Sequence, residues 1–314
     1  MEAKPKLNSI LVVHRITNYE IYAKKGKDSR VCSLLEDNDP SVAGMLQSHQ
    51  ENEESLRIVR DLLDGIGAEV QWHHRPQNHM LGQFDLVVSL GGDGTLLDAA
   101  QQISDDTPLI GVNSAPSSSV GYLCTTDAHG FREALELYMQ GQLPKHPMSR
   151  IEVEHNGEKC KTFALNDVLF AHGVPAATTR YRLCYRDRWE DHRSSGIWIA
   201  TPAGSTAGIQ SAGGESMSLS SKQLQFLIRE YYLPPKTSFC SSDISLYDEE
   251  ATPLLKGFLE EGEALEILPQ TDGSYLYLDG PWTRIPLAFG DRVLLRKAPQ
   301  PLCLLGAPRL AERQ

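Results

Sequence analysis

In the first half of the chain, short apolar runs alternate with segments whose apolar residues recur at helical spacing. Leu56, Val59 and Leu63 lie three or four residues apart, which predicts a helix, and Gly65 ends it. Runs typical of buried strands lie at residues 9–15, 68–72, 84–90 and 107–113. Because strands that alternate with helices form βαβ units, we expect an α/β domain built around a parallel sheet.

Two polar segments of this half also carry predictions. The stretch that follows residue 15 is rich in Lys, Asp and Asn, which predicts a loop or a mobile insertion. Ser48 and Glu51 have the spacing of a capping box, so we expect the helix that contains Leu56 to begin near them. Further along, Asp127 precedes apolar residues at helical spacing and predicts another capped helix.

From about Pro144 the pattern changes to many short strands with few helices. Residues 149–155 and 158–165 flank an Asn-Gly pair, which is the signal of a β-hairpin. Residues 263–269 and 274–279 predict a second strand–turn–strand unit around an Asp-Gly pair. This half is therefore expected to be largely antiparallel β structure.

These patterns divide the chain into two domains. We expect an α/β domain over residues 1–145 and a β domain over residues 146–289. The last apolar runs lie within residues 290–314, and their pattern leaves two alternatives open. They either end the second domain or return to the first.

Composition narrows the class of protein. The 314 residues are 40% hydrophobic and 23% charged, which is typical of a soluble globular protein, and no apolar run approaches the roughly 20 residues of a membrane span. The net charge of −11 argues against broad nucleic-acid binding. The N-terminus lacks an apolar signal core, and the six cysteines are scattered without a CxxC pair. We therefore expect a cytoplasmic protein with reduced thiols and no membrane partner.

The strand at residues 84–90 runs into the sequence GGDGT, which is the first candidate site. A strand followed by glycines and a helix start lets backbone N–H groups approach phosphate oxygens closely. Asp93 is suited either to hold Mg²⁺ or to act as a base. The spacing matches neither common phosphate loop, since Leu97 stands where GxGxxG needs its third glycine. The alternative is a tight turn with a helix-capping aspartate.

Two further segments are unusual. Residues 193–214 follow a strand pattern and contain many glycines, serines and threonines, which suits a flat ligand lying on the backbone. A flexible Gly/Ser linker is the alternative reading of that stretch. Asn166 and Asp167 interrupt an apolar run, so they form either a turn or a pair of side chains that face a ligand.

In this order, the motifs GGDGT, LND and TPAGSTA…SAGG resemble the NAD kinase family, whose pattern reads GGDGT, NE and DG…TPTGSTAY…SAGG. The resemblance runs from about Asp85 to Asp291. The TPAGSTA…SAGG block is its most specific part, because lipid kinases and phosphofructokinases carry only loops like GGDGT. The resemblance implies an N-terminal α/β domain with a parallel sheet and a C-terminal antiparallel β-sandwich, with the tail 290–314 joined to the first domain.

The chain departs from the family pattern at three positions. Ser195 replaces the aspartate before the TPTGSTAY block, Gly208 replaces the tyrosine that ends it, and Asp167 replaces the glutamate of NE. The segments RSSG, AGSTA and LQFLIRE are similar to the plant-type NADH kinase branch. In the family, the missing aspartate and tyrosine help to bind the dinucleotide. We therefore expect altered substrate binding, and the choice between NAD and NADH is open.

The resemblance implies a reaction in which ATP phosphorylates the 2′-hydroxyl of the adenosine ribose of NAD or NADH, with Mg²⁺ as cofactor. Asp93 is then the proton acceptor. Mg²⁺ would be held through the ATP phosphates, with Asp93 as a further candidate ligand. The residues expected to cradle the phosphates are Gly91, Gly92, Gly94 and Thr95. The residues expected at the dinucleotide are Asn166, Asp167, Ser195, Thr206, Ala207 and Arg193.

Two other functions compete with this one. The chain is alternatively a lipid or sugar kinase that shares only the GGDGT loop, or a catalytically weak nucleotide sensor. The family resemblance further implies a homodimer or homotetramer that binds small molecules and no nucleic acid.

Overall fold

The computed structural model describes residues 6–74, 83–232 and 252–309. The chain divides into two compact units. The first consists of residues 1–148 and 300–314, and the second of residues 149–299. The return to the first unit therefore begins at Gln300, and residues 290–299 of the expected tail lie in the second unit.

The first unit is an α/β domain with a mostly parallel sheet in the order β2-β1-β3-β4-β19-β6, to which β5 adds beside β4. Only β6 runs antiparallel to its neighbour among the strands that the structure describes here. The strands are β1 Ser9–His14, β2 Glu69–His74, β3 Leu86–Gly91, β4 Leu109–Asn113, β5 Thr126–Asp127, β6 Lys145–Met148 and β19 Leu302–Leu305. The apolar run of residues 302–305 thus completes the first sheet from the far end of the chain.

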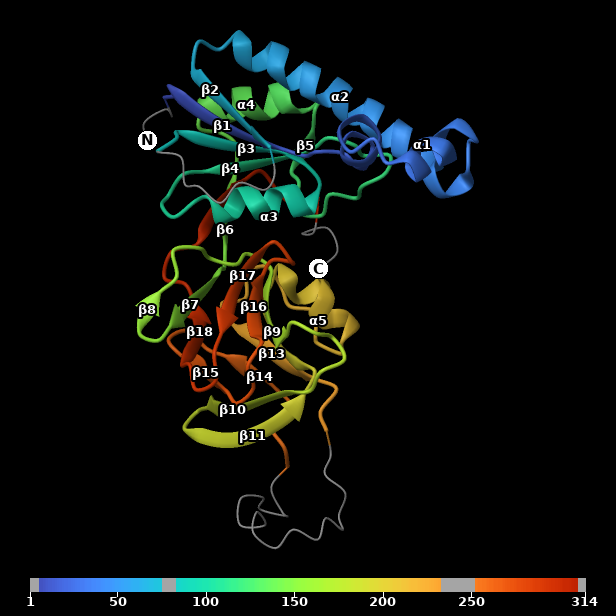
Figure 1. Cartoon of the computed structure of the whole chain (residues 1–314). Coiled ribbons are helices and arrows are strands. Elements are labelled where there is room, and N and C mark those ends of the chain that lie inside the picture. The colour runs from blue at the N-terminus through green and yellow to red at the C-terminus, as the bar shows by residue number, and fades with distance from the viewer. Residues whose placement is uncertain (1–5, 75–82, 233–251, 310–314) are drawn as a thin grey trace, which may run out of the picture. The chain divides into compact units, whose positions relative to one another are not determined.

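Helices cover both faces of this sheet (Figure 1). The apolar stripes of α2 and α4 pack on one face, around Val59, Leu63, Phe131 and Leu135, and α3 lies on the other. The helical segments are η1 Tyr19–Lys25, α1 Ser29–Glu36, η2 Pro40–Val42, α2 Ala43–Asp64, α3 Asp93–Gln101 and α4 Phe131–Met139.

Two predictions about the segment before α2 are wrong. The polar stretch predicted as a loop forms η1 and α1, and Asp28 caps α1 by accepting hydrogen bonds from the N–H groups of Arg30 and Val31. Neither segment buries a residue, and α1 spans only about two turns, which is too short for its apolar spacing to stand out from a polar stretch. The predicted capping box is also wrong, because α2 begins at Ala43 and Ser48 lies inside it.

The second unit is a sandwich of two antiparallel sheets, in the orders β11-β10-β15-β18-β7-β8 and β14-β13-β12-β9-β16-β17. The strands of the first sheet are β7 Ile151–His155, β8 Glu158–Lys159, β10 Thr179–Tyr185, β11 Arg188–Ser194, β15 Ala264–Pro269 and β18 Val293–Lys297. Those of the second are β9 Asp167–His172, β12 Gly196–Ala200, β13 Leu224–Arg229, β14 Lys256–Leu259, β16 Ser274–Leu278 and β17 Thr283–Leu287. Two short helices, η3 Gly204–Thr206 and α5 Gly208–Ser211, follow β12.

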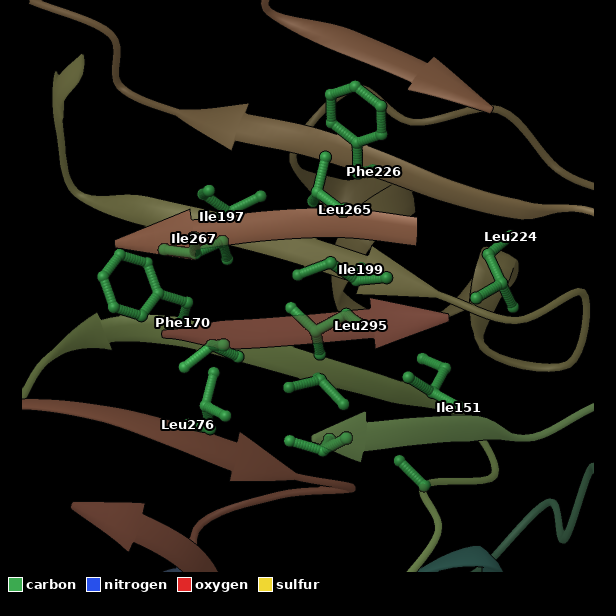
Figure 2. Packing of buried hydrophobic residues seen from close by; sticks show 14 of the residues in the cluster. Ile151, Phe170, Ile197, Ile199, Leu224, Phe226, Leu265, Ile267, Leu276 and Leu295 are labelled. Atoms are coloured by element: carbon green, nitrogen blue, oxygen red, sulfur yellow. The ribbon is translucent and has the colours of Figure 1, made fainter. Parts of the chain in front are cut away.

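Alternate residues of both sheets fill the core of the sandwich. Phe170, Ile197 and Leu276 of one sheet face Ile267 and Leu295 of the other, and all are buried (Figure 2). The expected fold, an α/β domain followed by an antiparallel β-sandwich, is confirmed.

The two predicted strand–turn–strand units have different outcomes. The first is a hairpin, in which β7 pairs with β8 across Asn156 and Gly157, both at positive φ. The second joins β15 to β16, which lie in different sheets. The Asp-Gly turn therefore carries the chain from one layer of the sandwich to the other.

Candidate functional site

In the first unit, the GGDGT loop forms a tight corner between β3 and α3. Gly91 ends the strand, Gly92 precedes the helix in extended conformation, and Asp93 is the first helical residue. A Cβ atom at position 91 would lie 2.3 Å from the Thr95 hydroxyl, and one at position 92 would lie 2.7 Å from the Ser119 hydroxyl. The side chains of Thr95 and Ser119 therefore leave no room for a side chain at either glycine, and the half-buried Gly92 and Gly94 are the glycines of the loop that a ligand can reach.

The carboxylate of Asp93 is held by backbone N–H groups from another loop. One oxygen accepts a hydrogen bond from the N–H of Tyr122 at 3.0 Å, and the other accepts from the N–H of Leu123 at 2.7 Å. Asp93 is only half-buried, and it lies in the first turn of α3, where the helix dipole favours negative charge. The acid is thus oriented while its remaining lone pairs stay available.

The loop that orients Asp93, which runs from Ser114 to Leu123, is anchored on α2. The Ser114 hydroxyl donates to the side-chain oxygen of Asn52 at 2.7 Å, and the Ser55 hydroxyl donates to the carbonyl of Ser114 at 2.9 Å. Ser48 and Glu51, the residues of the predicted capping box, instead bond to the loop at residues 117–118. The sequence analysis missed this contact. Its signal is the run of small polar residues at helical spacing in the otherwise amphipathic α2.

In the second unit, the segment that contains Asn166 is fixed by a carboxylate far away in the sequence. Asp279 accepts hydrogen bonds from the N–H groups of Leu165, Asn166 and Asp167, at 2.8, 2.7 and 3.1 Å. Asp279 itself has a φ of 52° and follows the end of β16. The sequence analysis placed this residue only at the end of the predicted strand 274–279 and assigned it no role.

The TPAGSTA block packs directly against Asn166. The N–H of Thr201 donates to the Asn166 carbonyl at 2.9 Å, and a Cβ atom at Gly204 would lie 2.1 Å from that same carbonyl oxygen. The side-chain oxygen of Asn166 is buried and accepts no hydrogen bond from the described residues. An acceptor in this state fits a ligand that donates an N–H or O–H group.

Ser205 lies in the stretch 193–214 that was predicted to suit a flat ligand, but its hydroxyl is turned into the protein. It donates to the Pro202 carbonyl at 2.7 Å and accepts from the N–H of Met217 at 2.9 Å, and Ser205 is fully buried. Its role is to hold the loop. The hydroxyl of Thr201 is also buried and donates to the Leu165 carbonyl at 2.6 Å, which leaves the half-buried Thr206 as the remaining hydroxyl of the motif.

A cavity of about 400 Å³ opens on the outward side of the sheet that contains β9 and β12. Two of the expected dinucleotide residues, Asp167 and Ser195, line it. Its other walls are mostly apolar and aromatic, formed by Leu169, Ala171, His172, Gly173, Val174, Pro175, Ala177, Trp198, Arg229, Tyr277, Gly280 and Pro281. This composition is typical of a small-molecule site with a few placed polar groups.

Burial, together with the nearby charge of Asp279, raises the pKa of Asp167 to about 7. A carboxyl with this pKa is close to half protonated near neutral pH, so it donates as well as accepts hydrogen bonds. Perturbed acids in cavities are frequent at functional sites.

The other expected residues lie elsewhere in the second unit. Asn166, Thr206 and Ala207 belong to the loops beside β9 and β12, outside the cavity walls. Arg193 lies exposed on β11 in the other sheet, opposite Arg180.

Comparisons with known proteins identify relatives of this chain. A family model described as the ATP-NAD kinase N-terminal domain matches residues 6–143. A protein named "Probable NADH kinase" from Oryza sativa subsp. japonica is 32% identical over 279 residues, which cover 81% of each chain. The chain belongs to the NAD kinase family. An Arabidopsis thaliana protein named "NADH kinase" is 29% identical over 281 residues, covering 81% of this chain and 84% of its own.

Solved structures of NAD kinases share this fold. An NAD kinase from Archaeoglobus fulgidus in complex with ATP has a TM-score of 0.65 at 16% identity, with 97% of this chain and 96% of that chain covered. The yeast NADH kinase complexed with NADH has a TM-score of 0.64 at 16% identity, with 97% and 85% covered. The similarity to NAD kinases spans most of the chain, which argues against a lipid or sugar kinase that shares only the GGDGT loop.

Proposed function

We propose that this chain is an NAD(H) kinase that transfers the γ-phosphoryl group of ATP to the 2′-hydroxyl of the adenosine ribose, producing NADP(H). The observation that carries this proposal is the oriented carboxylate of Asp93 in a corner where Gly91 and Gly92 exclude side chains. Membership in the NAD kinase family, with relatives named NADH kinase, supports the choice of substrate.

Asp93 accepts the proton of the 2′-hydroxyl as the new bond to phosphorus forms and the bond to the ADP oxygen breaks. A carboxylate is a weak base for an alcohol, so the proton moves late and most of the acceleration comes from positioning and charge neutralisation. The N–H groups of Asp93 and Gly94 at the start of α3 face the phosphates in this scheme. Thr95 supports the loop instead, because its N–H donates to the Gly92 carbonyl at 2.9 Å and its side chain is buried beside Gly91.

The first unit also has a donor suited to Mg²⁺. Mg²⁺ in phosphotransferases is usually bound by one or two carboxylates together with substrate phosphates. Asp93 fits this role because each of its oxygens accepts one N–H and keeps a free lone pair. When bound, Mg²⁺ neutralises the phosphate charge during transfer.

In the second unit, we assign the dinucleotide to the loops around Asn166 and to the cavity beside them. The unpaired side-chain oxygen of Asn166 accepts from an amino or hydroxyl group of the substrate. Asp167 and Ser195 supply further polar contacts from the cavity walls. Thr206 and Ala207 line the approach along the TPAGSTA loop. Arg193, which lies exposed on β11 of the other sheet, is assigned to a substrate phosphate on its charge.

The test compares Asp93→Asn with Asp61→Asn, which removes an exposed acid from α2 of the same unit. NADP and NADPH formation is measured with purified protein, ATP and Mg²⁺. Loss of the proton acceptor is expected to lower kcat by at least about 100-fold, while the control keeps normal activity. An Asp93→Asn enzyme with nearly full activity would contradict the mechanism. If the wild-type protein binds NAD(H) in calorimetry but phosphorylates neither form, it is a sensor.

We further propose that the chain assembles as a homodimer or homotetramer, as the family resemblance implies, and light scattering after gel filtration tests this. The structure describes no helix long and apolar enough to cross a membrane. A cytoplasmic location stays a prediction, which imaging of a tagged chain tests.

A further inference from the structure

The cavity of the second unit has an aromatic wall supplied by Trp198. This side chain points outward from β12, between the core residues Ile197 and Ile199. Its ring packs against Gly208, where a Cβ atom would lie 3.1 Å from the ring atom Cζ2. The absence of a side chain at position 208 therefore leaves room for the indole, and a flat ring in the cavity has a surface on which to stack.

The charged and titratable groups of the cavity lining favour a ligand without positive charge. The guanidinium of Arg229 lies 5.9 Å from the centre of the Trp198 ring, and its Nε is 3.6 Å from Glu230, whose side chain is 67% exposed and screened by solvent. Asp167 is the carboxylate of the lining, and burial keeps it from full ionisation at neutral pH. His172 accepts a hydrogen bond from the N–H of Val174 at its Nδ1, at 2.9 Å.

Ser195 completes this arrangement with a neutral side chain that both donates and accepts hydrogen bonds. Such a hydroxyl suits a carboxamide, which presents one oxygen acceptor and one amino donor. The oxidised and reduced forms of the dinucleotide differ at a single ring. The nicotinamide of NAD carries a positive charge, and the dihydronicotinamide of NADH carries none.

We propose that this cavity binds the nicotinamide ring of the substrate and that Arg229 makes the enzyme favour NADH over NAD. This inference rests on the proposed function, since it names which form of the dinucleotide that site selects. Trp198 stacks on the ring, Ser195 bonds its carboxamide, and Arg229 repels the cationic form. Because the guanidinium lies 5.9 Å from the centre of the Trp198 ring, a ring stacked on Trp198 carries its charge within roughly 6–9 Å of Arg229. Two unit charges at that separation in a partly exposed pocket change affinity by about tenfold, between the limits set by water and by a protein interior.

The experiment measures kcat/KM with NAD and with NADH for the wild type and four variants. Arg229→Gln removes the charge at similar length, and Arg229→Lys keeps it. Arg284→Gln removes a matched arginine that lies 5.3 Å from the ring of Tyr275, outside the cavity lining. Ser195→Asp adds a negative charge to the cavity wall. Dissociation constants for both dinucleotides are measured without ATP, by calorimetry, as a readout that does not depend on phosphorylation.

We expect Arg229→Gln to shift the preference for NADH over NAD about tenfold toward NAD, both in kcat/KM and in binding affinity. Ser195→Asp should shift both ratios in the same direction. Arg229→Lys and Arg284→Gln should leave the ratio unchanged. An unchanged ratio in Arg229→Gln, in an enzyme that still phosphorylates either form, overturns this inference and leaves the kinase function standing. If the wild type phosphorylates neither form, the proposed function fails, and the calorimetric ratios still decide whether Arg229 selects the ring.

Discussion

Replacement of Gly204 by alanine tests the contact that fixes the position of Asn166. The added Cβ atom would lie 2.1 Å from the carbonyl oxygen of Asn166 and 2.5 Å from its carbonyl carbon, where real contacts do not fall below 3.0 Å. One of the two backbones must therefore move by about 1 Å. The segment of Asn166 resists this movement because Asp279 holds three of its N–H groups.

The cost follows from that rigidity. Overpacking in a well-packed region costs about 1–3 kcal/mol, and a clash with fixed backbone lies at the upper end, so we expect a loss of about 3 kcal/mol. In a unit of this size each kcal/mol lowers the melting temperature by about 2–4 °C, which predicts a fall of about 6–12 °C. Dinucleotide affinity should fall as well, because the displaced segment carries Asn166.

Gly44→Ala is the matched control. It makes the same substitution near the start of α2, where an added Cβ atom meets nothing within 4 Å, and alanine is favoured over glycine by up to about 1 kcal/mol in a helix. Differential scanning calorimetry measures the melting temperature of both variants. If Gly204→Ala melts within 1 °C of the wild type, the packing of the TPAGSTA block on Asn166 is not as described.

Two further predictions concern the polar groups behind each part of the site. Burial raises the pKa of Asp167 from 3.8 to about 7, so the unfolded chain releases the carboxyl proton at a lower pH than the folded chain does. The free energy of unfolding therefore falls as the pH rises from about 4 to about 7. Asp167→Asn should therefore be more stable than the wild type at pH 8, by up to about 4 kcal/mol, with little difference near pH 4 in urea unfolding. Asn52→Ala removes the acceptor of the Ser114 hydroxyl and should lower kcat about tenfold with a smaller change in KM. The control Gln50→Ala, on the exposed side of α2, should change neither kcat nor KM. Equal kcat values in the two variants would mean that the contact between Asn52 and Ser114 does not position Asp93.

The parts of the fold that could be predicted from the sequence are those with a buried, repeating pattern. The strands β3 and β4 are buried along their whole length, and β1 is buried except at Ser9, so all three stand out as apolar runs. The helix α1 buries no residue, so its position depends on the cap by Asp28 and on contacts with the neighbouring segments η1 and η2. The cap was overlooked because only a short helix follows it, and contacts with other segments leave no local pattern.

The candidate site was predictable only where a motif is contiguous. The GGDGT corner and the TPAGSTA block are short segments whose glycines are required by close contacts, at 2.3 Å beside Gly91 and 2.1 Å beside Gly204. Trp198 and Arg229 could not be singled out, because residues that face outward from a buried strand have the same spacing as residues of its core. Asp279 was overlooked as an anchor since it acts on a segment more than 110 residues earlier in the chain.

The two units hold their key carboxylates by the same physical means. Asp93 accepts from the backbone N–H groups of Tyr122 and Leu123, and Asp279 accepts from three consecutive N–H groups at the start of β9. Neither the GGDGT corner nor its loop gives Asp93 a lysine or arginine partner among the residues that the structure describes. Backbone dipoles fix a carboxylate without a countercharge that would have to be displaced before it takes up a proton or a metal ion. Asp93 can therefore be placed accurately and still respond to the charge that the substrate and Mg²⁺ bring.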